Sequence, residues 1–312
     1  MEYLWKQGLK VSRVALGTAQ LGLKYGVANK TGKPEEKEIE KILATAFSKG
    51  INLLDTAYSY GDSERVIGRF LSRYPAKTQI LVASKLPKLR CSTPQMLGKE
   101  IEQNLEASLR NLQVDYIPIY LLHDENDMTA HQGYAFEFLA KQMGKGKIGL
   151  LGVSVYTPEA AEDALENPLT QVIQVPFNVF DQRLNHINFF QRAEEKKKLV
   201  LMRSVFLQGL FFLLEDSSCP QQFAGYSRYF QKIRTIAEDS CFKVGELACK
   251  YAAQKTQGVI LMGVESCSQL EENMKYISNR QELSPETMAA IEREFSTVPV
   301  NLIDPRQWRE SR

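Results

Sequence analysis

The feature that most constrains the fold is a repeated alternation of short apolar segments and helical segments. Apolar segments typical of buried strands begin near residues 14, 52, 80, 116, 148, 172, 200 and 259. Between them, apolar residues recur at the spacing of one helix face, as in the set Ile39, Ile42, Leu43, Ala46 and Phe47. Most of these units are close to the ~30 residues that a strand-helix-strand step needs. Eight of them predict a single (β/α)₈ (TIM) barrel domain over residues 1–312.

A doubly wound α/β sheet would produce the same alternation. The first strand, Val14 to Leu16, is not followed by the Gly-x-Gly-x-x-Gly turn that seats a dinucleotide in that fold, so the barrel is favoured. Ser63 is predicted to cap the helix after the second strand. The segment from Leu207 to Tyr229 lacks clear periodicity, which predicts a long functional loop before a helix over residues 233–250.

Charge and cysteine usage exclude several classes of protein. The formal net charge is +2, without the concentrated basic surface expected of nucleic-acid or membrane binders. No segment approaches the ~20 apolar residues of a membrane span. The five cysteines are scattered without a Cys-x-x-Cys pair, which predicts reduced thiols in the cytoplasm and no zinc site. His123 with Asp124 and Glu125 does not have the ligand spacing of a metal centre either, so no metal is expected.

Ionisable residues end three consecutive predicted strands. The second strand runs into Asp55, the third ends at Lys85 and the fourth at His123, while Tyr60 lies in the loop after the second. Each residue alone has an ordinary interpretation as a rim charge, a surface histidine or a packing tyrosine. The carboxyl ends of barrel strands converge on one mouth, however, where these groups would perturb one another. The pattern therefore predicts a catalytic site at that end of the barrel.

These four side chains suit proton delivery to a carbonyl oxygen. A phenol has a reference pKa of about 10, and a nearby lysine ammonium is expected to lower the pKa of Tyr60. Asp55 would hold Lys85 charged and in place, and His123 would orient or polarise the carbonyl oxygen. The set contains no hydride source, so a reduction would require a nicotinamide cofactor.

Several motifs resemble the aldo-keto reductase superfamily, and the likeness extends from about Val14 to Ile277. The matching residues are Gly17-Thr18, Asp55-Thr56-Ala57, Tyr60-Gly61, Ser63-Glu64, Lys85 and His123. The resemblance implies an NAD(P)H-dependent reductase of aldehydes or ketones that also oxidises the alcohols. It further implies that Tyr60 is the general acid, that Lys85 and Asp55 tune it, and that His123 positions a small carbonyl substrate.

The resemblance also implies a cofactor-binding set, which consists of Gly17, Thr18, Ser154, Gln174, Arg203, Ser204, Leu207, Gly209, Gly263, Glu265, Gln269, Glu272 and Asn273. Within it, Ser154 and Gln174 match positions that hold the nicotinamide carboxamide. Two positions depart from the family pattern. Val155 replaces the usual asparagine after the serine, and Arg203 replaces an aromatic ring that stacks on the nicotinamide. A planar guanidinium can also stack, so the second departure is tolerable.

The choice between NADPH and NADH depends on the residues expected at the adenosine end of the cofactor. Most members of the superfamily prefer NADPH and often hold its extra phosphate with a lysine and an arginine at the positions of Gly263 and Gln269. Both charges are absent here, and Glu265 would repel the phosphate unless Lys275 or Arg280 compensates. Ser268 would begin a helix whose N-terminus favours anions. The expectation is therefore NADPH with NADH also possible, and a weaker preference for NADPH than is usual.

Polar residues after two of the predicted strands bear on the substrate. Polar residues after strand four (Asp124, Glu125, Asn126 and Asp127) and after strand six (Asn178, Asp181 and Gln182) predict a polar rim that would suit a sugar-like substrate. Two alternatives remain open: an aldolase-type enzyme using Lys85 as a Schiff base, and a cofactor-binding regulatory subunit on the same fold.

Overall fold

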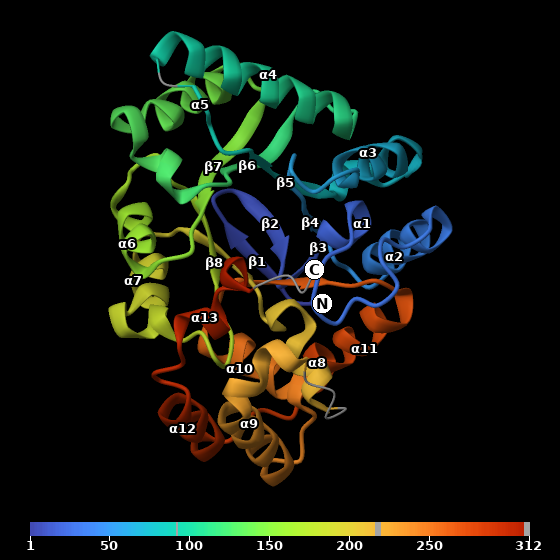
Figure 1. Ribbon diagram of the computed structural model, residues 1–312. Helices are drawn as coiled ribbons and strands as arrows, with labels where there is room; N and C mark the ends of the chain where they lie inside the picture. The colour runs from blue at the N-terminus through green and yellow to red at the C-terminus, as the bar shows by residue number, and fades with distance from the viewer. Residues whose placement is uncertain (92, 216–219, 309–312) are drawn as a thin grey trace.

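The computed structural model describes residues 1–91, 93–215 and 220–308, and eight parallel strands close into a barrel at its centre (Figure 1). The strands follow the order β10-β3-β4-β5-β6-β7-β8-β9, so neighbours in sequence are neighbours in the sheet. All eight predicted strands are confirmed: β3 (Val14–Gly17), β4 (Leu53–Asp55), β5 (Leu81–Leu86), β6 (Ile117–Leu122), β7 (Ile148–Ser154), β8 (Val172–Pro176), β9 (Leu199–Arg203) and β10 (Val259–Gly263).

Two apolar layers hold the barrel together. The inner layer fills the barrel with residues such as Leu53, Ile119 and Leu201, each fully buried. The outer layer packs the other face of each strand against the helices. Because parallel strands are buried on both faces, they appear in the sequence as continuous apolar runs.

A ring of helices surrounds the strands (Figure 1). The helix α2 ends at Ser48, and Gly50 follows with a φ of +87°, which suits glycine. The helices are α1 (Ala19–Gly22), α2 (Glu36–Ser48), α3 (Ser63–Arg73), α4 (Pro94–Leu112), α5 (Tyr134–Gly144), α6 (Pro158–Glu166), α7 (Phe189–Glu195), α8 (Leu210–Glu215), α9 (Ser227–Asp239), α10 (Val244–Lys255), α11 (Cys267–Ser278), α12 (Pro285–Glu294) and α13 (Val300–Ile303).

A hairpin that was not predicted precedes the barrel. Its strands β1 (Tyr3–Lys6) and β2 (Leu9–Ser12) pair antiparallel, and Figure 1 shows them across the centre of the ring. The two turn residues, Gln7 and Gly8, have φ values of 52° and 77°, as a two-residue hairpin turn requires. Val11 belongs to the same apolar cluster as the barrel interior, so the hairpin closes the end of the barrel at which the strands begin.

The expected long loop after β9 was wrong. Much of this segment is helical, because α8 begins at Leu210 and the short 3-10 helix η6 (Gln221–Tyr226) leads into α9. Residues 216–219, which include Cys219, lie outside the described part of the chain. The helix expected over residues 233–250 is two helices, α9 and α10, separated at residues 240–243. Phe211 and Leu214 of α8 are buried, so the apolar run in this segment packs into the outer layer.

Ser63 does not cap α3 as predicted. It is the first residue of the helix, and Asp62 precedes it without a capping side-chain bond. Its hydroxyl accepts a hydrogen bond from Thr56 Oγ1 at 2.9 Å and donates to the carbonyl of Thr18 at 3.0 Å. Ser63 therefore ties together the loops that follow β3 and β4, at the mouth of the barrel. Within the described ranges, no helix has the length and apolarity needed to cross a membrane.

Candidate active site

The buried pair Lys85–Asp55 lies at the ends of adjacent strands. Lys85 Nζ donates to Asp55 Oδ1 at 2.8 Å and to the carbonyl oxygen of Thr56 at 2.7 Å. Lys85 is fully buried and Asp55 is 5% exposed. A buried charge needs a partner of opposite sign, and each residue supplies one to the other. The two bonds also occupy the ammonium that a Schiff-base mechanism would have to release.

Tyr60 and His123 complete the predicted set. Their rings meet edge to face with centroids 5.6 Å apart, and Lys85 Nζ lies 4.9 Å from the centroid of the Tyr60 ring. His123 Nδ1 lies 2.9 Å from Ser59 Oγ in a hydrogen bond that the sequence did not suggest. The structure thus brings all four predicted catalytic residues together, and adds Ser59 behind the imidazole.

The electrostatics of Tyr60 differ from expectation. Burial raises the pKa of Tyr60, the charge of Asp55 raises it further, and only Arg203 lowers it. Lys85 was expected to lower the pKa of Tyr60. That expectation is wrong, because Asp55 neutralises the charge of the Lys85 ammonium. Burial, with the charges of Lys85 and Arg203, lowers the pKa of His123 to about 3. At neutral pH the site therefore holds a protonated phenol and a neutral imidazole.

Ser154 and Gln174 lie behind Asp55. Ser154 Oγ donates to Gln174 Oε1 at 3.1 Å, and Gln174 Nε2 donates to Asp55 Oδ1 at 2.7 Å. Both residues are 1% exposed, and neither lines a described cavity. Their amide and hydroxyl groups hold the Asp55 carboxylate in this structure, where contact with a nicotinamide carboxamide was expected.

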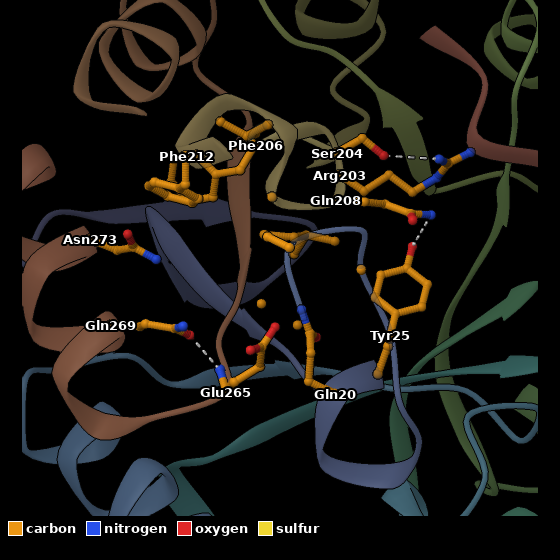
Figure 2. A pocket seen from close by; sticks show the side chains of 18 of the residues that line it. Gln20, Tyr25, Arg203, Ser204, Phe206, Gln208, Phe212, Glu265, Gln269 and Asn273 are labelled. Carbon is orange, nitrogen blue, oxygen red and sulfur yellow. Dashed lines mark hydrogen bonds between the residues drawn. The ribbon is translucent and has the colours of Figure 1, made fainter. Parts of the chain in front are cut away.

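A groove of about 540 Å³ is lined by Asp55, Tyr60 and Asn273 among others, and Figure 2 shows part of its lining, including Asn273. Ten of the thirteen predicted cofactor residues line it: Gly17, Thr18, Arg203, Ser204, Gly209, Gly263, Glu265, Gln269, Glu272 and Asn273. Leu207 is fully buried and does not line it. Glu272 is held by Lys243 Nζ at 2.9 Å and by the Tyr276 hydroxyl at 3.0 Å.

Two loops meet over one side of the groove. Val27 N donates to the carbonyl of Gln208 at 3.0 Å, and Gln208 Nε2 donates to the Tyr25 hydroxyl at 3.2 Å, as Figure 2 shows for the second bond. A Cβ on Gly209 would lie 2.7 Å from that of Ala28, so glycine permits this approach. Tyr25 and Gly26 therefore form part of a groove wall that the sequence did not indicate.

The far end of the groove carries the residues expected at the adenosine phosphate. Glu265 N donates to Gln269 Oε1 at 2.7 Å, and burial raises the pKa of Glu265. A Cβ on Gly263 would lie 2.5 Å from Gln20 Nε2, a contact that no sequence pattern signalled. The helix α11 begins at Cys267, one residue earlier than expected, and Ser266 caps it by accepting from Gln269 N.

A second cavity of about 670 Å³ opens on the other side of His123. Tyr58, Tyr156 and Arg306 line it, together with Lys88, Arg90 and Asn104. Asp124 and Glu125 of the predicted polar rim also line it, whereas Asn126 and Asp127 do not.

The part of the rim predicted after strand six was wrong. Asn178, Asp181 and Gln182 are buried and bond within the protein. Asn178 accepts from the backbone of Phe180 and Asp181, and Asp181 pairs with Arg183. These polar side chains stabilise the loop after β8, so they do not face a substrate.

The chain is similar to known proteins in both sequence and fold. Residues 13–294 match the family model described as the aldo/keto reductase family. Aldo-keto reductase YhdN from Bacillus subtilis is 28% identical over 218 residues, covering 67% of this chain and 63% of that protein. L-galactose dehydrogenase from Arabidopsis thaliana is 25% identical, and the match covers 93% of this chain and 92% of that protein. The solved structure of a glycerol dehydrogenase from Gluconobacter oxydans, 26% identical, superposes with a TM-score of 0.70 over 95% of each chain.

Proposed function

The chain belongs to the aldo/keto reductase family and is an NAD(P)-dependent oxidoreductase of carbonyl compounds and alcohols, and we propose that Tyr60 is its general acid. One observation carries this proposal. Tyr60 lines the groove, while His123, edge to face against it, lines the second cavity. The phenol therefore lies where a cofactor in the groove and a substrate in the cavity would meet.

The groove fits a nicotinamide dinucleotide. Gly17 and Gly263 leave strand ends without side chains, and the N-terminus of α11 offers amide donors toward phosphate oxygens. Ser204 and Gly209, with the loop carrying Tyr25, would cover the pyrophosphate, and Asn273 would line the adenosine end. When bound, the cofactor supplies the hydride that adds to the carbonyl carbon.

The remaining steps belong to side chains of this protein. Burial keeps Tyr60 protonated, so in reduction its hydroxyl can give a proton to the carbonyl oxygen. His123 is neutral, and because Nδ1 is bonded to Ser59, Nε2 is the nitrogen left to hydrogen-bond that oxygen. The Lys85–Asp55 pair lies beside the phenol ring and fixes it. In alcohol oxidation the same proton returns to Tyr60.

The variant Tyr60→Phe tests the assignment. We expect kcat/KM to fall by about 100-fold or more, the typical contribution of general acid catalysis, while dinucleotide affinity is retained. Tyr116→Phe is the matched control, because Tyr116 is an exposed tyrosine just before β6, away from both cavities. Full turnover by Tyr60→Phe would overturn the proposal.

We further propose that the substrate is a small hydroxylated carbonyl compound, such as a sugar or a sugar derivative. Charged and hydrogen-bonding side chains, among them Asp124, Glu125 and Arg306, dominate the second cavity. Relatives named for L-galactose and glycerol agree with this chemistry. The test is a panel of aldoses, polyols, small polar aldehydes, steroids and long aliphatic ketones. Preference for the last two groups would contradict the proposal.

For the cofactor, we propose that NADPH and NADH are both used, with a weaker preference for NADPH than is usual in the family. Glu265 lines the groove, and among the described residues it forms no ion pair with Lys275 or Arg280. Gln20 occupies the space beside Gly263 where a lysine would have to fit.

The variant Glu265→Ser tests the cofactor proposal. Removing a carboxylate near the phosphate is expected to shift the ratio of kcat/KM values toward NADPH by about tenfold. Glu271→Ser, on the exposed face of α11, the helix that follows Glu265, should leave the ratio unchanged. An unchanged ratio in Glu265→Ser would show that this carboxylate does not meet the phosphate.

A further inference from the structure

Arg203 is a cation without a carboxylate partner. It ends β9 and lines the groove beside Asp55 and Tyr60, and no ion pair within residues 1–91, 93–215 and 220–308 includes it. Its charge nevertheless acts on the catalytic groups, since it lowers the pKa values of Tyr60 and His123. Half-burying a guanidinium without a carboxylate partner costs free energy, which its hydrogen bonds offset only in part.

Both terminal nitrogens of the Arg203 guanidinium already have hydrogen-bond partners within the protein. One terminal nitrogen donates to the carbonyl of Val155 at 2.9 Å, and the other lies 3.4 Å from Ser204 Oγ, the contact drawn in Figure 2. Nε is buried without a partner in the described structure. A bidentate clamp on an anion needs two free adjacent N–H groups, so this arginine is poorly placed to hold a substrate carboxylate.

The two faces of the guanidinium differ. One face lies against the ring of Tyr156, 3.9 Å from its centroid, and Tyr156 lines the second cavity and not the groove. The other face is therefore the surface that Arg203 presents to the groove. A planar face that is open beside Tyr60 suits stacking with a flat ring.

We propose that Arg203 stacks its charged face on the nicotinamide ring and thereby makes the protein bind the reduced cofactor more tightly than the oxidised one. The inference rests on the proposed function. The oxidised ring is positively charged and the reduced ring is neutral, so the guanidinium repels only the oxidised form. At about 4 Å, full screening by water would leave a difference of about fivefold in affinity, and the weaker screening in a partly buried groove makes it about tenfold.

Among the described residues, no carboxylate forms an ion pair with Arg203 that would cancel this effect. Asp55 is already paired with Lys85, and Figure 2 shows Glu265 beside Gln269, apart from Arg203. A tenfold preference for the reduced form would raise the potential of the bound two-electron couple by about 30 mV. The internal equilibrium between bound reactants would then favour alcohol oxidation over carbonyl reduction.

The experiment measures dissociation constants of NADH, NAD⁺, NADPH and NADP⁺ without substrate, by calorimetry or nucleotide fluorescence. We expect wild-type protein to bind each reduced form about tenfold or more tighter than its oxidised form. In Arg203→Gln this ratio should fall by about tenfold, mainly because the oxidised form binds better. Arg203→Lys, which keeps the charge, should retain most of the ratio.

Arg306→Gln is the matched control. Arg306 covers the other side of the Tyr156 stack, with its guanidinium carbon 3.6 Å from the ring centroid, but it lines only the second cavity. Its loss should not change the ratio. An equal loss in Arg203→Gln and Arg306→Gln would overturn the inference, because the effect would not belong to the groove face of Arg203.

The possible failures can be told apart. If wild-type protein binds none of the four nucleotides, the proposed function itself fails. If all four bind and Arg203→Gln leaves the ratio unchanged, only the present inference is overturned. A rise in KM confined to carboxylate-bearing substrates, with the ratio unchanged, would instead assign Arg203 to substrate binding and would also overturn it.

Discussion

Lys85 is a residue whose contribution depends on one partner. Burial lowers the pKa of Lys85, and Asp55 opposes that shift through its charge and its hydrogen bond. Asp55 has two donors, Lys85 and Gln174, so loss of the lysine leaves the carboxylate with one neutral partner. Breaking one side of a buried ion pair costs more than removing both charges together.

The variant Lys85→Met should abolish turnover and lower the free energy of unfolding by about 3–5 kcal/mol, as measured by denaturant titration. In the double variant with Asp55→Asn, much of the stability should return because no charge remains unpaired, while turnover stays absent. If Lys85→Met alone unfolds at the wild-type denaturant concentration, the pair does not stabilise the fold as argued.

Asp127 is a second buried carboxylate, and it holds the loop after β5. It accepts a hydrogen bond from Leu89 N at 3.0 Å, and burial raises its pKa to about 6. Asp124 and Glu100 raise this pKa through like charge, and Lys88 opposes them. The folded protein therefore holds a proton on Asp127 at a pH at which the unfolded chain, with a reference pKa of about 3.9, has released it.

A raised carboxyl pKa stabilises the fold at low pH, and that stabilisation is lost as pH rises through the folded value. Relative to Asp127→Asn, whose amide can still accept from Leu89, wild-type protein should lose about 1–2 kcal/mol of unfolding free energy between about pH 4 and pH 7, after allowance for solvent screening. Exposed Asp163→Asn is the control. A difference independent of pH would contradict this assignment.

The sequence predicts which residues lie at strand ends, but not the direction in which their side chains point. Asp55, Tyr60, Lys85 and His123 were predicted correctly to meet, because strand ends fix their positions. Asn178, Asp181 and Gln182 follow a strand in the same way, yet they turn inward to satisfy backbone groups of their own loop. Residue type and position do not distinguish these two outcomes.

At the scale of elements, the catalytic loop depends on the short helix α1. A Cβ on Gly22, the last residue of that helix, would lie 1.8 Å from the carbonyl oxygen of Tyr60 and 2.5 Å from Ser63 N. Gly61, with a φ of +56°, makes the same close approach from the other side. The backbone of Tyr60 is therefore held in place by contact between two glycines.

The variant Gly22→Ala should displace the Tyr60 loop and lower kcat by about 100-fold or more, because small misplacements of a catalytic group are costly. Overpacking should also destabilise the fold by about 1–3 kcal/mol. Gly144→Ala makes the same substitution at a helix end with nothing within 4 Å of the added carbon, and it should leave activity unchanged. A wild-type kcat in Gly22→Ala would mean that α1 does not hold the Tyr60 loop in its catalytic position.

The elements themselves were predictable to different degrees. Barrel strands such as β8 were readable because both faces are buried and the run is continuously apolar. The helix α8 was missed because its six residues are almost all apolar and show no polar face. The strands β1 and β2 have four residues each and mixed burial, which leaves too short a pattern to recognise.

At the scale of the whole molecule, the barrel has two different ends. The carboxyl ends of the strands carry the groove and the second cavity. The opposite end is closed by the hairpin, which Asn52 fastens by accepting from Ser12 N at 2.8 Å. In barrels of this kind, functional residues lie at the first end, and residues that stabilise the fold lie at the second. Eight strand starts in the sequence predicted this division in outline, but they did not indicate how the closed end is sealed.

Val11 therefore provides a test of the division. It is fully buried and joins the hairpin to the apolar interior with Leu4 and Leu9 packed against it. Val11→Ala removes two methyl groups from this seal and should lower the free energy of unfolding by about 1–2.5 kcal/mol, measured by denaturant titration. Because the change lies at the closed end, kcat and KM of the remaining folded protein should be unaltered. Loss of turnover without loss of stability would mean that the two ends are coupled and that the hairpin does more than close the barrel.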